Sequence, residues 1–225
     1  MMALTADPQF LELPLIRGEV LRDARLQRVL KRMVAEYRRP ANGGPNAGGA
    51  RDPHAYADFG FSIHPDQGEL LYLLCRALNA RRVVDFATSV GFSTLYLAAA
   101  MRDNGAGRVI GAEIVPAKIA TARRNLEEAG LSDYVEIRAG DARQTLRDAG
   151  GAIDLALIDG WPGSTGPSLS LEVMRVIAPQ MRPGAIAVND NAEDDYLEFV
   201  RDGGGAFRSM TLPLKGGTEL SVRAA

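Results

Sequence analysis

Arg81-Arg-Val-Val-Asp85-Phe-Ala-Thr-Ser-Val-Gly91-Phe-Ser-Thr94 is the stretch that decides the fold, and it continues into the apolar residues 95–101. Two branched residues before Asp85 predict a buried strand, the residues up to Gly91 a tight turn, and the alanine-rich continuation a helix. Such a turn places backbone N–H groups at the carboxyl edge of a parallel sheet, where open α/β folds bind ligands. A dinucleotide-binding turn has three glycines and this turn has one, so a ligand without phosphates fits better.

The composition is that of an ordinary globular domain. The chain has 225 residues and a formal net charge of −2, with both signs spread along it, so nothing favours binding to nucleic acid or to an anionic membrane. No apolar run approaches the roughly 20 residues of a membrane span, and the first residues lack a secretion-signal pattern, so we expect a cytoplasmic protein. Cys75 is the one cysteine, and we expect it to be a buried thiol without a catalytic role.

Strand and helix patterns alternate through most of the chain. We expect strands over residues 81–85, 108–113, 135–139, 153–159 and 185–189, and helices over residues 65–78, 95–101, 116–130, 141–148, 169–178 and 195–201. Repeated βα units predict a mostly parallel, Rossmann-like sheet with helices on both faces. Residues 207–212 and 218–222 are two further strands joined by Pro213-Leu-Lys-Gly-Gly217, which is typical of an antiparallel hairpin. The predicted fold class is therefore α/β with a C-terminal hairpin.

Residues 1–58 are predicted to form an N-terminal segment, and residues 59–225 the main domain. Residues 1–17 contain two prolines and are expected to be irregular. Residues 19–37 have apolar side chains at helical spacing, with arginines and lysines between them, which predicts an amphipathic helix. Its apolar side fits either the core of the same chain or a second subunit, so a homodimer is one expected assembly. The glycine-rich residues 41–50 are a flexible connection or a lid.

Acidic residues follow the strands at the edge where a ligand would bind. Asp85 closes the first strand and Glu113 the second. A carboxylate offers two acceptors to two adjacent hydroxyls, so Glu113 suits a ribose diol. Gly140-Asp141-Ala142 follows the third strand. Two interpretations of Asp141 are open: it accepts a hydrogen bond from an exocyclic amine such as that of adenine, or it caps the helix that begins at Ala142.

Asp159, Asp190 and Asn191 follow the fourth and fifth strands. Two carboxylates and an amide oxygen suit a hard cation such as Mg²⁺. The alternative is that Asp159 orders its own turn while Asp190 and Asn191 cap the last helix. Trp161 either lies over a flat ring of the ligand, closes the substrate pocket, or packs in the core.

The two histidines give weaker signals. We expect His54 to be a solvated loop residue. His64 precedes a helix that begins with proline, and we expect it to contact a cofactor through its backbone. No Ser/His/Asp order, no metal-binding spacing of cysteines and histidines, and no P-loop is present.

Residues 61–222 resemble the class I S-adenosylmethionine-dependent methyltransferases, in particular the cation-dependent, catechol-type O-methyltransferases and their bacterial relatives. The order and spacing of six segments carry the resemblance. They are Val83-Val-Asp-Phe-Ala-Thr-Ser-Val-Gly-Phe-Ser-Thr94, Gly111-Ala-Glu113, Gly140-Asp-Ala142, Leu157-Ile-Asp-Gly-Trp161, Arg182-Pro-Gly-Ala185 and Val188-Asn-Asp-Asn191. The resemblance implies a seven-stranded sheet whose last two strands form a reversed hairpin.

The resemblance also implies roles for individual residues. The first turn wraps the methionine part of S-adenosylmethionine, Glu113 holds the ribose, and the segment at Asp141 borders the adenine. Mg²⁺ is implied at Asp159, Asp190 and Asn191. The full set expected to bind the cofactor is His64, Asp85, Ala87, Thr88, Gly91, Ser93, Glu113, Gly140, Asp141, Ala142, Asp159 and Trp161.

The chain departs from this family at two positions that matter. The residue after the tryptophan is typically a lysine that acts as the base on the substrate hydroxyl, and here it is Pro162. Residues 162–167 also form a longer loop than usual, so we expect a reshaped acceptor pocket. Ala87 replaces the usual glycine after the first strand. Lys215, His54 and His64 are candidates to replace the missing base.

The expected activity is transfer of the sulfonium methyl group to a phenolic, enolic or catechol-like hydroxyl of a small molecule. Mg²⁺ chelated by two substrate oxygens would lower the pKa of that hydroxyl, and Asp159 is then the expected catalytic residue. Two alternatives are a metal-independent methyltransferase of the same fold and a protein that binds S-adenosylmethionine without catalysis. An NAD-dependent oxidoreductase is disfavoured by the single glycine in the first turn.

Overall fold

The computed structural model describes residues 4–5, 20–37, 39–40, 52–60, 62–160, 166–202 and 204–225. Seven of its strands share one sheet, and two short strands pair separately. The sheet strands are β3 (Arg82–Phe86), β4 (Arg108–Glu113), β5 (Val135–Ala139), β6 (Ile153–Ile158), β7 (Met181–Asp190), β8 (Phe207–Leu212) and β9 (Thr218–Arg223). The separate pair is β1 (Leu4–Thr5) with β2 (Arg39–Pro40), which run antiparallel.

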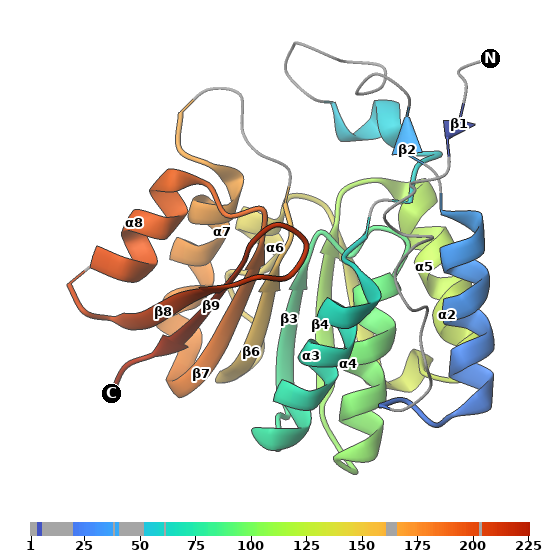
Figure 1. Cartoon of the computed structure of the whole chain (residues 1–225), viewed down its shortest axis with the longest axis horizontal. Helices are drawn as coiled ribbons and strands as arrows, with labels where there is room; N and C mark the ends of the chain where they lie inside the picture. The colour runs from blue at the N-terminus through green and yellow to red at the C-terminus, as the bar shows by residue number, and fades with distance from the viewer. Residues whose placement is uncertain are drawn as a thin grey trace.

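The sheet has the order β5-β4-β3-β6-β7-β9-β8 (Figure 1). Neighbours from β5 to β7 are parallel, while β9 runs antiparallel to both β7 and β8. This confirms the predicted Rossmann-like sheet with a reversed C-terminal hairpin. Since β3 has its successor β4 on one side and β6 on the other, the strand order reverses there, which is where open α/β sheets form a ligand crevice.

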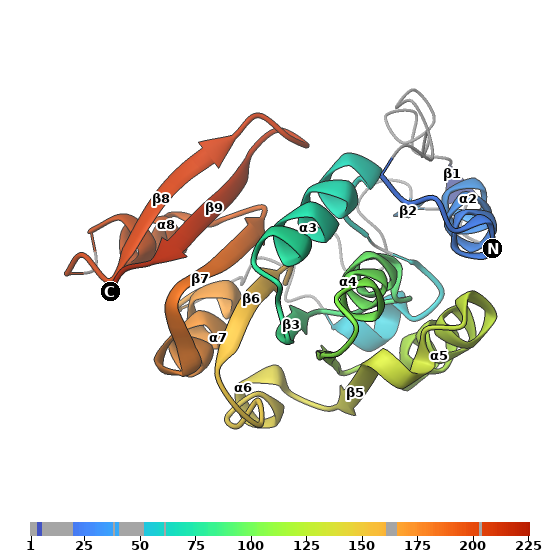
Figure 2. The ribbon, with the colours of Figure 1, turned by 90° about the horizontal axis from the view of Figure 1, so that it is seen from below.

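Helices cover both faces of the sheet (Figure 2). One layer contains α3 (Pro65–Ala77), α4 (Phe92–Asp103) and α5 (Pro116–Ala129), and the other contains α6 (Ala142–Thr145), α7 (Leu169–Ile177) and α8 (Asp194–Asp202). Short 3₁₀ turns are η2 (Pro53–Tyr56), η3 (Ser132–Tyr134) and η4 (Ala178–Gln180). Successive strand residues point to opposite faces, so Val83 is buried with the first layer and Val84 with the second.

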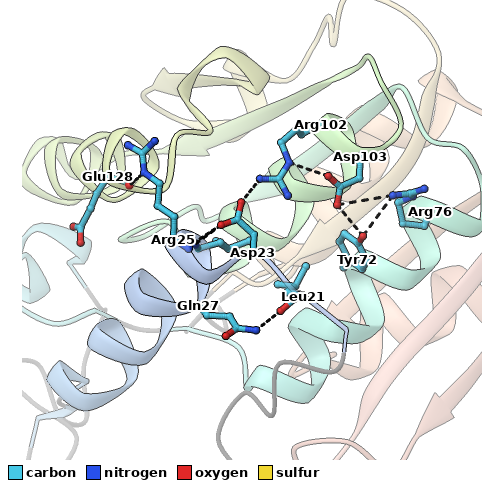
Figure 3. A network of polar contacts seen from close by, with 10 residues as sticks. Leu21, Asp23, Arg25, Gln27, Tyr72, Arg76, Arg102, Asp103 and Glu128 are labelled. Atoms are coloured by element: carbon cyan, nitrogen blue, oxygen red, sulfur yellow. Dashed lines mark hydrogen bonds and ion pairs between the residues drawn. The ribbon is translucent and has the colours of Figure 1, made fainter.

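The N-terminal helix α2 (Ala24–Glu36) packs outside α5, and its buried side chains belong to the same core as the first helix layer. A polar network holds its start (Figure 3). The Asp23 carboxylate accepts a hydrogen bond from Arg102 of α4 at 2.5 Å, and the neighbouring Asp103 accepts one from Tyr72 of α3 at 2.9 Å. The apolar side of the helix packs on the core of its own chain, and the expected homodimer stays a prediction.

Several predicted boundaries were wrong. The first helix begins at Ala24 and not at residue 19, because the Asp23 side chain accepts hydrogen bonds from the N–H groups of Arg25 and Leu26 and so caps it. Residues 1–17 are not wholly irregular, since β1 lies within them. The helix expected to reach residue 148 ends at Thr145, and the positive φ of Gly150 and Gly151 turns the chain soon afterwards.

Other boundaries agree closely with the prediction. The strands at 108–113, 135–139 and 207–212 are confirmed to the residue. Cys75 is fully buried, and burial raises the pKa of its thiol, which agrees with an inert packing role. None of the helices in the described part of the chain is long and apolar enough to cross a bilayer. The division at residues 58 and 59 stays a prediction.

Candidate functional site

A cavity of about 390 Å³ lies at the carboxyl ends of the parallel strands. Besides the strand ends, its wall includes Tyr37 after α2, Lys118 on α5 and Lys215 from the turn between β8 and β9. Seven predicted site residues line it: Ala87, Glu113, Gly140, Asp141, Ala142, Asp159 and Asn191. Six others are placed by the structure but are not part of its lining: His64, Asp85, Thr88, Gly91, Ser93 and Asp190. Trp161 lies outside the described residues, as does Pro162.

Asp85 stabilises the first turn from inside the core. It is fully buried, and its carboxylate accepts hydrogen bonds from Thr94 Oγ1 at 2.5 Å and Ser93 Oγ at 3.1 Å. Burial raises the pKa of Asp85 to about 6, although these two hydroxyls oppose the shift. The side chain therefore ties the end of β3 to the first turn of α4 and does not face the cavity.

The first turn follows a path that side chains rarely adopt. Ala87 has φ 66°, Ser89 has φ 51°, and Gly91 has φ 90° at the N-terminus of α4. A Cβ atom at Gly91 would lie 3.2 Å from the Cβ of Ala122, so a glycine is needed there for space as well as for conformation. Ala87 thus adopts a left-handed conformation, which is the conformation that glycine takes most readily.

Glu113 closes β4 and is held by backbone donors. Its Oε1 accepts hydrogen bonds from the N–H groups of Ile114 and Val115, each at 2.8 Å, and its Oε2 accepts one from Ser89 at 2.8 Å. A carboxylate has about four acceptor positions, so about one remains, on Oε2, for a ligand hydroxyl. Glu113 thus joins the ends of β3 and β4 and still faces the cavity.

Lys118 lies beside Glu113 and was missed by the sequence analysis. It is 5% exposed, lines the cavity, and stands in the first turns of α5. Burial lowers the pKa of Lys118, and the nearby Glu113 carboxylate opposes that shift. The only signal in the sequence was its position five residues after an acid that ends a strand.

Asp141 caps α6 and also lines the cavity. Its carboxylate accepts hydrogen bonds from the backbone N–H of Arg143 at 2.8 Å and from the guanidinium of the same residue. The hydrogen bonds to Arg143 lower the pKa of Asp141. The capping interpretation is therefore what the structure displays, while the predicted contact with a ligand amine stays a prediction.

Asp159 and Asp190 form a pair of acids at the ends of β6 and β7, with Asp159 facing the cavity. Asp190 is fully buried; its Oδ1 accepts a hydrogen bond from Gln67 Nε2 at 2.9 Å, and its Oδ2 accepts one from Asn191 Nδ2 at 3.0 Å. Burial, followed by the charge of Asp190, raises the pKa of Asp159 well above its ordinary value, and Lys215 only partly offsets this. The charge of Lys215 therefore does not fully neutralise the two carboxylates.

Lys215 provides a positive charge at this pair. Its Nζ forms an ion pair with Asp190 Oδ2 and donates a hydrogen bond to the carbonyl oxygen of Ser62 at 3.3 Å. Although burial lowers the pKa of Lys215, the carboxylates of Asp159 and Asp190 raise it on balance. Of the three candidates to replace the missing base, Lys215 is the one the structure brings to the cavity.

The side chains as placed do not fit a divalent ion at Asp159, Asp190 and Asn191. Both oxygens of Asp190 already accept hydrogen bonds, and Asn191 turns its NH₂ group toward that carboxylate. Mg²⁺ requires open oxygen ligands. Within the described ranges, no cluster of three or more histidines, cysteines or acids is placed to hold a metal. The predicted metal site is thus not confirmed, and Lys215 Nζ lies against Asp190 Oδ2.

The histidines lie away from the cavity lining. His64 is buried at the N-terminus of α3, and its backbone N–H donates to Gln67 Oε1 at 2.7 Å. The backbone contact expected between His64 and a cofactor stays a prediction. His54 is exposed, as expected, although it lies in the turn η2 and not in an irregular loop.

Comparison with known proteins gives one consistent result. A family of methyltransferase domains matches residues 86–192. A catechol O-methyltransferase of Niastella koreensis is 32% identical over 146 residues, which are 63% of this chain and 60% of that protein. A putative O-methyltransferase of Mycolicibacterium smegmatis is 32% identical over 150 residues, which cover 63% of this chain and 70% of the relative. The chain therefore spans less than two thirds of the catechol relative.

A solved structure shares the fold. The cofactor-bound protein Rv0187 from MTB superposes with a TM-score of 0.63 at 27% sequence identity. The match covers 77% of this chain and 90% of the other. The strand order and the reversed hairpin described above are thus those of a known fold.

Proposed function

The chain belongs to the class I S-adenosylmethionine-dependent O-methyltransferases of the bacterial catechol type, and we propose that it transfers the methyl group of S-adenosylmethionine to a hydroxyl oxygen of a small molecule. The observation that carries the proposal is one cavity with Glu113 at one end and Asp159 with Lys215 at the other. The first end suits a nucleoside, and the second suits an ionisable oxygen.

The cofactor end is proposed to bind the adenosyl group of S-adenosylmethionine. Oε2 of Glu113 accepts a hydrogen bond from one ribose hydroxyl, because its remaining acceptor position faces the cavity. Ile114, which is 42% exposed and lines the same cavity, provides an apolar surface for the base. Asp141 and Ala142 border the base on the opposite side, as expected from the sequence.

The reaction requires the protein mainly to position two reactants. S-adenosylmethionine supplies an electrophilic methyl carbon on a sulfonium when it is bound. The chain's own residues then hold the acceptor oxygen in line with that carbon and exclude water. An acceptor whose hydroxyl ionises more readily than that of an alcohol, such as a phenol or an enol, is favoured, because the neutral oxygen is a poor nucleophile.

The acceptor end offers few groups for deprotonation. Pro162 cannot accept a proton, and burial and the charge of the neighbouring Asp190 raise the pKa of Asp159. Magnesium assistance does not enter the proposal, because Lys215 Nζ lies against Asp190, where open oxygen ligands would be required. The metal-independent alternative weighed from the sequence is therefore the form of the proposal that the geometry supports.

Calorimetry and a product assay test the proposal in sequence. We expect S-adenosylhomocysteine to bind with a stoichiometry of one per chain, and S-adenosylmethionine to yield a methylated product with at least one member of a panel of catechols, monophenols and enols. Mass spectrometry of the product locates the methyl group on oxygen. Absence of S-adenosylhomocysteine binding would refute the proposal.

A second candidate function rests on Pro162. A chain that has lost the usual lysine and does not replace it would bind S-adenosylmethionine without catalysis. Binding of S-adenosylhomocysteine together with no product from any of the acceptors would favour this candidate.

A further inference from the structure

Four of the five non-glycine residues with positive φ in the described chain line the candidate cavity: Ala87, Ser89, Asn191 and Lys215, the fifth being Asn79. Residues in this conformation persist only where the surrounding structure holds them. Lys215 has φ 46° and is followed by Gly216 and Gly217. A glycine would adopt this conformation without strain, so the lysine side chain has a structural or functional reason to be there.

The contacts of Lys215 place its ammonium group at the acceptor end of the cavity. The side chain reaches from the hairpin to the end of β7, where it pairs with Asp190 Oδ2 and donates to Ser62 O. Its side chain keeps 22% of its surface exposed, and the residue lines the cavity. An ammonium has three N–H donors, and two of them are accounted for within the described residues.

The remaining side chains hold this ammonium in place. Gln67 fixes Asp190 from the far side, through Oδ1, and is itself tied to Thr218 Oγ1 at 2.8 Å. Because Thr218 begins β9 and Lys215 lies in the turn before it, the carboxylate and the ammonium are anchored by the same strand. The positive charge is therefore set at a fixed position and not on a mobile surface side chain.

We propose that Lys215 supplies, as a tethered cation, the positive charge that binds the ionised oxygen of the acceptor, so that methyl transfer in this chain needs no divalent metal. The inference rests on the proposed function. A cation within about 4–6 Å of a hydroxyl favours its ionised form. Asp159 and Lys215 line the same cavity.

The chemical step balances without a further reactant. The acceptor hydroxyl releases its proton to solvent, and the resulting oxygen anion is held by the third N–H of Lys215. That oxygen forms a bond to the methyl carbon while the carbon–sulfur bond breaks, and the electron pair of the broken bond stays on sulfur. The products are a methyl ether and the neutral thioether S-adenosylhomocysteine.

Three variants distinguish the effect of the charge of Lys215 from the effect of its backbone conformation. Lys215→Met keeps the length of the side chain without its charge, and Lys215→Arg keeps the charge. Lys215→Gly removes the side chain and relieves the positive φ. Lys31→Met, at an exposed position on α2, is the matched control. Each is measured with S-adenosylhomocysteine by calorimetry, with Mn²⁺ by electron paramagnetic resonance, and for turnover in excess chelator.

We expect the unmodified protein to turn over equally with and without chelator and to bind no Mn²⁺. Lys215→Met is expected to lower kcat roughly 100-fold, as for removal of one donor to a developing oxyanion. Its affinity for S-adenosylhomocysteine stays unchanged, and Lys215→Arg retains most of the activity. Lys215→Gly is expected to bind Mn²⁺, because Asp159 and Asp190 are then left without their cation.

Two results would overturn the inference. One is Mn²⁺ binding to the unmodified protein with loss of turnover in chelator, and the other is full turnover by Lys215→Met. Both are distinct from failure of the proposed function, because the Mn²⁺ and S-adenosylhomocysteine titrations need no acceptor. A protein that binds neither S-adenosylhomocysteine nor any acceptor refutes the proposed function itself.

Discussion

The two acidic corners of the cavity are held in opposite ways. At the first corner, all three donors to the Glu113 carboxylate are backbone N–H groups, from Ser89 and from the two residues that follow Glu113. At the second corner, the three donors that the described residues provide to the Asp190 carboxylate are side chains, from Gln67, Asn191 and Lys215. The path of the backbone determines the first corner, and the side chains that come together from separate elements determine the second.

This difference determines which substitutions each corner tolerates. Backbone donors are present whatever the side chains are, so the first corner depends on the course of two strand ends and on Glu113 itself. Side-chain donors are specific, so a single substitution at the second corner leaves a buried polar group without a partner. Buried charges in such surroundings are costly unless they are paired. We therefore expect loss of ligand binding from changes at Glu113 and loss of stability from changes around Asp190.

The largest expected effect is that of Glu113→Ala on cofactor affinity. The variant loses the charged acceptor for a ribose hydroxyl and the link between the ends of β3 and β4. A hydrogen bond to a charged group contributes about 1.5–3 kcal/mol, so with the loss of the link we expect S-adenosylhomocysteine to bind roughly 100- to 1000-fold more weakly. Calorimetry measures this, with the exposed Glu127→Ala as control. A loss below about 5-fold would mean that Glu113 only orders the loop.

Gln67→Leu breaks the second corner instead. Gln67 is 2% exposed and bonds to Asp190 Oδ1, Thr218 Oγ1 and the N–H of His64. Removing the amide leaves these buried groups unpaired, and each costs about 1–3 kcal/mol. We expect the free energy of unfolding, measured in urea, to fall by about 3 kcal/mol.

The exposed Gln144→Leu is the control for that measurement. It carries the same change of side chain without a buried partner, so its unfolding should be nearly unaltered. An equal effect of both substitutions would show that Asp190 does not depend on Gln67.

Asp85→Asn tests the buried acid beneath the first corner through its pH dependence. The native pKa of Asp85 is raised from 3.8 to about 6, so between these values the folded chain holds a proton that the unfolded chain releases. Stability from this group is therefore present below about pH 4 and is lost as the pH rises to about 6. One pKa unit corresponds to about 1.4 kcal/mol, so we expect the variant to be about 3 kcal/mol more stable than the parent at pH 8.

The same comparison at pH 4 should show a much smaller stabilisation, because folded Asp85 is then protonated and unfolded Asp85 is already about half protonated. Urea unfolding at the two pH values measures the difference, and the exposed Asp133→Asn provides the control. A stabilisation that is equal at both pH values would assign the effect to hydrogen bonding and not to charge.

The smallest effect is expected for Ala87→Gly. Ala87 already follows a left-handed path, and glycine would relieve that strain while increasing the entropy of the unfolded chain. These effects oppose each other, so the free energy of unfolding should change by less than about 1 kcal/mol. The affinity for S-adenosylhomocysteine should stay within about 3-fold, because backbone conformation and not the methyl group sets this corner. A larger gain in affinity would show that the alanine methyl group obstructs the ligand.

The sequence by itself determined the sheet and the first corner. Strand alternation, helical spacing and turn residues are local signals, and they predicted β4, β5 and β8 to the residue. Parallel strands also bring their carboxyl ends to one edge, so acids such as Glu113 and Asp159 were expected at one site. The donors that hold Glu113 are backbone groups of that same edge. The start of α2 was missed because its cap depends on the single residue Asp23.

Only the tertiary structure decided what surrounds Asp190. Gln67 is 123 residues away from it in the chain and Lys215 is 25 residues away, and no spacing in the sequence links these positions. Lys215 was one of three candidates for a missing base, all without a spacing argument, and its role follows from the hairpin that brings it to the end of β7. Side-chain partners from separate elements depend on how helices and strands pack, and that packing is a collective property of the whole core that no local pattern encodes.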